Sequence, residues 1–259
     1  MSPRATDAAY AIATFVVVLV VWEATLRLLG VASYFIPAPS DIAVSLVRGR
    51  ALYASNYLTT LGSTLAAFAF AFIPGVVLGT LVAELRFAER TLYPLLVALQ
   101  SMPRIALAPI IIVWFGFGPE SKIVLGAISA FFPVFLNTVH GMATTDPEQL
   151  ALMRSLRATS LQVFCKVKLP GALPFLLAGA NIGIIFAILA VIVGEFLGAN
   201  RGMGFLIVNE SSQLDTPGVF ASVLLLSATG LCFHYGLQAL RRRLLFWAAG
   251  SEVAGSSLQ

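Results

Sequence analysis

The stretch DPEQLALMRSLRATSLQVFCKVKLP, Asp146–Pro170, is the only long polar segment in an otherwise apolar chain. Asp146 is a good helix N-cap, and Pro147 suits the first turn of the helix that follows. The pattern predicts a short amphipathic helix, a polar gap at residues 158–160, and a second helix that runs into Leu169 and Pro170. Such a helix can dock in the groove of a soluble partner. Alternatively, its apolar side packs against its own protein.

The composition places the rest of the chain in a membrane. Of its 259 residues, 59% are hydrophobic and 11% are charged, whereas a soluble domain is about one quarter charged. A helix needs about 20 apolar residues to cross a bilayer. Residues 1–259 therefore form one all-α membrane domain with six expected spans, at 8–29, 59–83, 93–115, 122–142, 173–197 and 219–240.

The first span follows Arg4 and resembles a signal peptide in position. Its apolar run is longer than the 7–15 residues, roughly, of a signal-peptide core, and no convincing cleavage site follows before Pro37. We therefore expect a retained helix. The next segment, YFIPAPSDIAVSLVRGR (34–50), is too short to span and predicts a helix on the outer membrane surface, with an ordinary loop as the alternative.

Lysine and arginine indicate the orientation, because cytoplasmic loops are enriched in them. With the N-terminus inside, ten lie on the inner side and five on the outer side. We expect both termini and residues 146–170 to face the cytoplasm, and we attribute the positive net charge to topology rather than to nucleic-acid binding. The inner set is Arg4, Arg86, Arg90, Arg154, Arg157, Lys166, Lys168, Arg241, Arg242 and Arg243; the outer set is Arg27, Arg48, Arg50, Lys122 and Arg201.

The sequence contains no motif for catalysis or metal binding. It has no glycine-rich phosphate loop, no His-Glu-x-x-His and no Gly-x-Ser-x-Gly, and only two histidines. Cys165 and Cys232 have no metal-site spacing. We therefore expect no enzyme activity, no catalytic residue, no metal and no cofactor bound by this chain.

Several motifs resemble the inner-membrane permease subunits of ABC importers, especially the nitrate, sulfonate, taurine and bicarbonate branch. The resemblance covers about Ser33 to Trp247. It implies the type I permease fold, with six transmembrane helices and a cytoplasmic coupling-helix loop at 146–170. The motifs are YFIPAPSDI (34–42), SMPRIALAPIIIVWFGFG (101–118), ISAFFPVFLNTVHGM (128–142), DPEQL (146–150), KLPGALPFLLAG (168–179) and GEFLGANRGMGFLI (194–207).

The resemblance also implies partners and a location. Two permease subunits, identical or paralogous, would enclose a path in a bacterial inner membrane, above two ATPase subunits that bind ATP and Mg. A periplasmic or lipid-anchored binding protein would deliver a small anion such as a sulfonate, taurine, nitrate or bicarbonate. The implied ATPase-coupling residues are Ala151, Leu152, Met153, Arg154, Ser155, Leu156, Arg157, Ala158, Thr159 and Ser160.

The coupling loop departs from the family pattern at two points. Counted back from Leu169 and Pro170, the family's Glu-Ala-Ala falls on residues 151–153 and its glycine falls on Arg157. An arginine does not turn easily into the left-handed region, so the loop is expected to bend in another way. The missing acidic residue removes one contact that the family makes with its ATPase.

Polar residues within the spans are candidates for the translocation path, because membrane depth makes polar groups costly. They are Gln100, Ser101, Arg104, Asn137 and Glu195, and the candidates also include Met102, which Gln100, Ser101 and Arg104 flank. Arg104 could attract an anion, or its long side chain could extend to the membrane interface. The amide and hydroxyl groups could instead cross-link helices.

Two acidic residues each have a candidate partner. Glu195 could line an outer gate, or it could form an ion pair with Arg201. Glu23 has Arg27 four residues later, and we expect these two to pair.

Two other functional classes stay open at this point. A secondary transporter should contain inverted repeats and several coupled ionisable groups, and neither is found in the sequence. A membrane anchor or receptor would recruit a cytoplasmic protein through residues 146–170 without transporting a solute.

Overall fold

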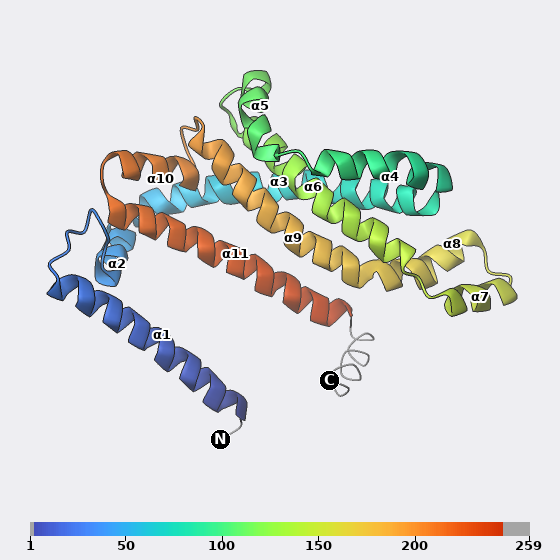
Figure 1. Ribbon diagram of the computed structural model, residues 1–259, viewed down its shortest axis with the longest axis horizontal. Coiled ribbons are helices and arrows are strands. Elements are labelled where there is room, and N and C mark those ends of the chain that lie inside the picture. Colours follow the sequence, from blue (N-terminus) through green and yellow to red (C-terminus); the bar gives the residue numbers. More distant parts are fainter. Residues whose placement is uncertain (1–2, 246–259) are drawn as a thin grey trace.

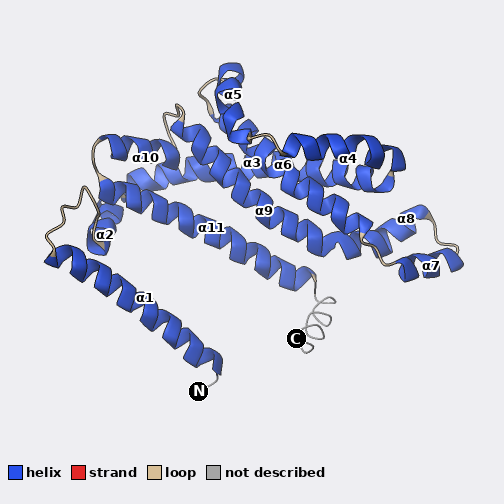
Figure 2. Cartoon of the chain, in the orientation of Figure 1, coloured by secondary structure: helices blue, strands red, loops and turns tan. Residues whose placement is uncertain are grey.

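The computed structural model describes residues 3–245, except for the side chains of residues 3–9, 11, 86 and 89, which include Arg4 and Arg86. All regular elements in this part are helices (Figure 2). They are α1 (Pro3–Leu28), α2 (Pro39–Arg48), α3 (Arg50–Glu84), α4 (Arg86–Gln100), the 3₁₀ turn η1 (Arg104–Leu107), α5 (Ala108–Phe115), α6 (Pro119–Ala143), α7 (Pro147–Ser155), α8 (Ser160–Val163), the π turn η2 (Phe164–Lys168), α9 (Leu169–Phe196), α10 (Met203–Ser212) and α11 (Thr216–Leu244).

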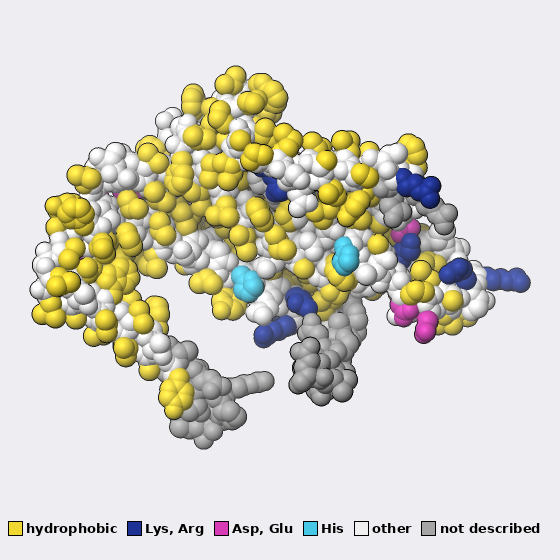
Figure 3. All heavy atoms as spheres, in the orientation of Figure 1, with side chains coloured by type: hydrophobic (Ala, Val, Ile, Leu, Met, Phe, Trp, Pro, Cys, Tyr) yellow, Lys and Arg dark blue, Asp and Glu magenta, His cyan; other side chains and the backbone are white. Residues whose placement is uncertain are grey.

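Helices α3, α6 and α9 form the centre of the bundle, and α11 runs beside α9 (Figure 1). Helices α2 and α10 lie at one end, whereas α7 and α8 project at the opposite end. Apolar side chains cover much of the outer surface (Figure 3), as expected for helices that face lipid. The all-α fold is therefore confirmed.

Close contact between the central helices depends on small residues. A Cβ atom on Gly79 of α3 would lie 2.7 Å from Cβ of Thr138 on α6. A Cβ atom on Gly179 of α9 would lie 2.8 Å from Cβ of Asn137 on the other side of α6. These distances are below van der Waals contact, so α6 is held between α3 and α9 at a separation that only glycine permits.

Four helices of the described part are long and apolar enough to cross a membrane, and a bent pair of shorter helices would make five. The four contain the expected spans at 59–83, 122–142 and 219–240 and all but the last residue of the span at 173–197, and α3 starts nine residues before the first of these, at Arg50. The expected span at 8–29 falls on α1. Its position across the membrane stays a prediction.

The third expected span, 93–115, is not one continuous helix. It divides into α4, which ends at Gln100, and a segment that starts at Arg104, and the two parts make an angle of 83°. Pro103 lies at the break and has no amide hydrogen to continue the α4 ladder. The third apolar segment therefore changes direction sharply at Pro103.

Helix α1 stands apart from the bundle in Figure 1 and joins it at α2 through a polar network. Arg27 pairs with Glu23 at 3.0 Å, as expected, and with Asp41 at 2.8 Å. The hydroxyl of Ser40 donates to Glu23 at 2.7 Å. This network fixes the angle at which α1 leaves α2. Within the segment 34–50 the predicted helix is present as α2, and its place on the outer membrane surface stays a prediction.

A second buried contact joins α3, α10 and α11 at the same end. Glu210 of α10 is 6% exposed and accepts hydrogen bonds from the Tyr53 hydroxyl at 3.0 Å and the Ser222 hydroxyl at 2.9 Å. Burial raises the pKa of Glu210 above its usual range. The two hydroxyls supply the hydrogen bonds that a buried carboxyl group needs.

The glycine contact between α3 and α6 predicts a sharp difference between two positions of one helix. Gly79→Ala would place its Cβ 2.9 Å from the carbonyl oxygen of Phe135, so the helices must separate. Gly62→Ala meets nothing within 4 Å. We expect Gly79→Ala to destabilise the protein by about 1–3 kcal/mol and to lower its thermal midpoint in detergent, and Gly62→Ala to cause no loss. Equal midpoints for the two variants would contradict this packing.

Candidate functional site

The segment between α6 and α9 forms two short helices, as the sequence predicts. The Asp146 carboxylate accepts a hydrogen bond from the amide of Glu148 at 2.8 Å and caps α7. Thr159 and Gln162 form a reciprocal capping box at the start of α8, with bonds of 2.9 and 3.3 Å. Both helices are therefore defined locally, without help from the membrane bundle.

The turn between these helices is left-handed at Arg157, where φ is 53°. The amide of Ala158 donates to the Met153 carbonyl, and the amide of Arg157 donates to the Arg154 carbonyl, both at 3.0 Å. These two bonds define a Schellman ending, which usually has glycine at the left-handed position. The expectation that the loop bends in another way was wrong, because the arginine adopts the glycine conformation.

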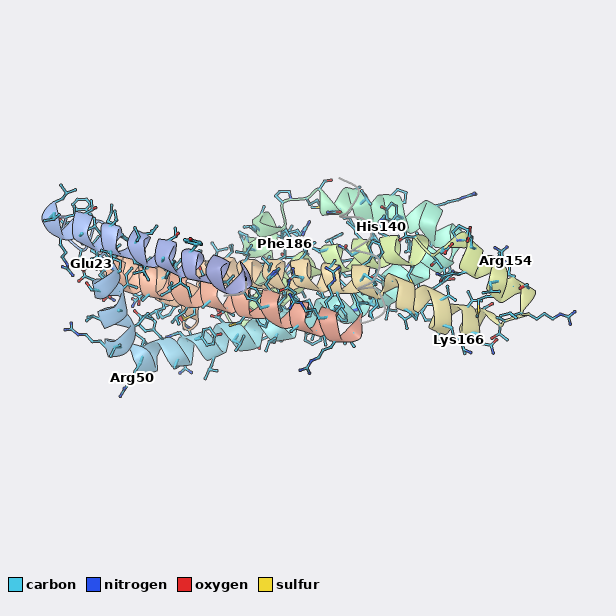
Figure 4. All side chains as sticks on the ribbon, turned by 90° about the horizontal axis from the view of Figure 1, so that it is seen from below. Glu23, Arg50, His140, Arg154, Lys166 and Phe186 are labelled. Carbon is cyan, nitrogen blue, oxygen red and sulfur yellow. The ribbon has the colours of Figure 1, made fainter. Side chains whose placement is uncertain are left out.

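Leucines of α7 and α8 are exposed at the end of the molecule that carries Arg154 and Lys166 in Figure 4. Leu152 is 60% exposed, Leu156 is 67% exposed and Leu161 is 71% exposed. We call these three leucines the docking face. Their exposure favours contact with a partner over packing against the bundle.

The docking face is connected to the bundle by the π turn η2. Lys168 in this turn forms an ion pair with Glu84 at the end of α3, with Nζ–Oε1 at 2.7 Å. Phe164, at the start of the turn, packs against a buried cluster of Met142, Ala172 and Leu176. A displacement of α7 and α8 would therefore act on α3, α6 and α9 together.

The candidate path residue Arg104 is bound by carbonyl oxygens. Its guanidinium donates to the Ser129 carbonyl at 3.1 Å and to the Gln100 carbonyl at 3.2 Å. Pro133 has no amide hydrogen, so it leaves Ser129 without its usual helical partner. Arg104 also lies over the rings of Phe132 and Phe186, at 5.0 and 5.7 Å. The guanidinium thus supplies hydrogen bonds to backbone carbonyl oxygens of α4 and α6.

The other candidates do not gather at one point. Ser101 and Met102 are exposed at the end of α4. The Asn137 amide donates to the Pro133 carbonyl at 2.8 Å. Because Asn137 contacts α9 at Gly179, it lies about 24 Å along that helix from Glu195, at about 1.5 Å per residue. Their common role in a path stays a prediction.

Glu195 is 3% exposed and forms no ion pair with Arg201 in the described part of the chain. Its carboxylate instead accepts hydrogen bonds from the Thr60 hydroxyl at 2.8 and 3.0 Å and from the Gly204 amide at 2.7 Å. The expected pairing with Arg201 was wrong. Glu195 joins the end of α9 to α3 and to the start of α10.

Sequence reasoning missed the partners that complete this contact. The Gly202 amide donates to the Asn56 side chain, and the Met203 amide donates to the Thr60 hydroxyl, both at 2.8 Å. We call these bonds, with those of Glu195, the α3 lock. Asn56 and Thr60 lie four residues apart, on one face of α3, which was the available signal.

Comparison with known proteins identifies the family. Residues 75–246 match the family described as binding-protein-dependent transport system inner membrane component. A formylaminopyrimidine transport permease protein of Halalkalibacterium halodurans is 36% identical, over 90% of this chain and 93% of that protein. A taurine transport system permease protein of Escherichia coli is 28% identical, over 95% of this chain and 92% of that protein.

The structure of the MetNI methionine ABC transporter, in inward-facing conformations, matches 72% of this chain and 93% of its own chain, with a TM-score of 0.64 and 22% identity. This likeness confirms the type I permease fold. Permease subunits of this family are not enzymes, since a separate subunit hydrolyses ATP. The family match identifies an ABC importer permease and so excludes the two other functional classes, the membrane anchor and the secondary transporter.

The chain thus belongs to the binding-protein-dependent inner membrane components, the permease subunits of ABC importers.

Proposed function

We propose that residues 151–160 couple this permease to its ATPase. The observation that carries the proposal is the docking face, three exposed leucines on a rigid helical pair that is tied to the bundle by Lys168 and Glu84. Apolar helix faces of this kind bind in the grooves of partner proteins. Arg154 and Arg157 lie beside the leucines and are exposed, so they add charge at the rim of the contact.

The partners form a complex around this chain. Two permease subunits, identical or paralogous, enclose the path, and two ATPase subunits bind ATP and Mg beneath them. A periplasmic or lipid-anchored binding protein delivers the solute at the opposite end. This arrangement places both termini and α7 in the cytoplasm, as the distribution of lysine and arginine indicates.

The solute that the protein carries is a small oxyanion in this proposal. The relative named for taurine and the resemblance to the sulfonate and nitrate branch support this class. The relative named for formylaminopyrimidine favours a second candidate, a small nitrogen heterocycle. Arg104 no longer supports the anion, because carbonyl oxygens and aromatic rings occupy its guanidinium.

Reversing the charge of the docking rim tests the coupling proposal. We expect Arg154→Glu with Arg157→Glu to lower co-purification of the ATPase, and solute-dependent ATP hydrolysis, by about tenfold or more, because close unlike charges across an interface become like charges. The matched control is Arg48→Glu with Arg50→Glu, at the opposite end of the bundle, and it is scored by ATPase co-purification alone because the binding protein acts at that end. Full ATPase binding by the first variant would refute the assigned docking site.

The left-handed turn gives an independent test of coupling geometry. Arg157→Gly should retain coupled ATP hydrolysis, because glycine adopts the observed φ of 53° without strain. Arg157→Val should uncouple the complex, because a β-branched residue avoids this region. Arg154→Val removes a positive charge from the helical part of α7 and controls for charge loss. Equal coupling by the glycine and valine variants would show that the turn has no role.

Transport by the reconstituted complex distinguishes the two solute classes. Proteoliposomes that contain this permease, its ATPase and its binding protein should accumulate labelled taurine when ATP is present on the ATPase side. Labelled formylaminopyrimidine should not accumulate under the same conditions. The reverse pattern would assign the heterocycle as the solute and would leave the coupling proposal intact.

A further inference from the structure

A cavity of about 350 Å³ lies at the end of the bundle away from the docking face. It opens between the α5–α6 connection and the α9–α10 connection, which lie at the same end in Figure 1. Its volume is within the range of about 300–1,000 Å³ for small-molecule sites. Six polar side chains contribute to its wall, those of Thr59, Ser63, Lys122, Glu195, Asn200 and Arg201.

Lys122 is the central charge of this cavity. It is 3% exposed, and its ammonium donates one hydrogen bond, to the carbonyl oxygen of Phe117. An ammonium has three donors, and the described residues supply no partner for the other two. Lys122 also lies in the first turn of α6, where the helix dipole disfavours a positive charge. A buried cation in this position needs a negative partner.

Glu195 lines the same cavity, and the carboxylates of Glu195 and Glu120 attract the Lys122 ammonium through space, but Glu195 forms no ion pair with it. Its carboxylate is not within 4 Å of the Lys122 ammonium, and the Thr60 hydroxyl and Gly204 amide bind it instead. The hydrogen bonds of the α3 lock fix the position of the Glu195 carboxylate but do not remove its negative charge. An anionic group in the cavity would find the ammonium of Lys122 available.

Further donors surround Lys122. Ser63 is 7% exposed, and its hydroxyl forms no hydrogen bond with the described residues. Arg201 is exposed at the rim and forms no ion pair within that part of the chain. The α3 lock holds the loop that carries Asn200 and Arg201, because the amides of residues 202–204 are all bound. The donors are therefore pre-positioned rather than mobile.

We propose that this cavity binds the oxyanion group of the transported solute, with Lys122 as the charged ligand and with Ser63 and Arg201 as further donors. The inference rests on the proposed function, since it requires an anionic solute. It assigns recognition of the anionic group to the end of the path that receives the solute from the binding protein. Glu195 acts as a positioning residue, because it holds the loop and does not contact the anion.

Ethanesulfonate and ethanesulfonamide are the probes for this site, because they are similar in size and differ in charge. Binding is measured by isothermal titration to the permease–ATPase complex in nanodiscs, without the binding protein. We expect the parent complex to bind ethanesulfonate and not ethanesulfonamide. Lys122→Met should weaken binding of ethanesulfonate by about tenfold or more, because it removes a charged hydrogen bond. Lys122→Arg should retain most of the affinity.

Arg50→Met is the matched control, since Arg50 is exposed at the start of α3 and lies outside the cavity. An equal loss of affinity in Arg50→Met, unchanged affinity in Lys122→Met, or equal binding of the two probes would overturn the inference. So would a parent complex that hydrolyses ATP but does not bind ethanesulfonate. If Lys122→Met fails to assemble, Lys122→Arg and Ser63→Ala decide. Lys122→Arg should retain most of the affinity for ethanesulfonate, and Ser63→Ala should weaken it. Co-purification of the ATPase is scored first. Its absence would count against the proposed function, whereas its presence without binding of ethanesulfonate would count against this inference alone.

Discussion

Hydrocarbon offers no hydrogen bonds to the backbone, so each carbonyl that a proline leaves without a partner must find one inside the protein. This constraint explains why the third apolar segment turns by 83° and still remains in the bundle. Arg104 at the turn binds the last carbonyl of α4 and the carbonyl of Ser129 that Pro133 leaves free. A single guanidinium therefore donates hydrogen bonds to carbonyl oxygens of two helices. The glycine contacts of α3, α6 and α9 then fix the helices around it.

The same constraint separates the charged residues by role. A sequence gives the depth of a charge along an apolar segment, and depth made Arg104 the natural attraction point for an anion. The structure shows its partners, which are two carbonyl oxygens that use two of its five N–H donors and two aromatic rings beside the guanidinium. Lys122 lies in the first turn of a span, a position that does not by itself indicate a binding role. Two of its three N–H donors form no hydrogen bond with the described residues.

Much of the fold follows from local signals in the sequence. Four of the six apolar windows, the Asp146 cap and the Glu23–Arg27 pair depend on residues that are near one another in the chain, and all of these are present. One error concerns a contact between distant segments, and another concerns a local turn. Glu195 is bound by Thr60, 135 residues away, and no local pattern shows that this hydroxyl is nearer than Arg201. At Arg157, two hydrogen bonds of the helix ending compensate for a cost of about 1–2 kcal/mol for a left-handed residue.

Helix α9 connects the two functional ends of the molecule. It continues directly from the π turn behind the docking face and ends at the α3 lock, a length of about 42 Å for its 28 residues. Gly179 and Gly183 allow close packing of α9 against α6, so the two helices cannot slide past each other without loss of these contacts. The Lys168–Glu84 pair adds α3 to the same body. In the proposed coupling, a force applied at the docking face would therefore move α3, α6 and α9 together as one unit rather than deform any one helix.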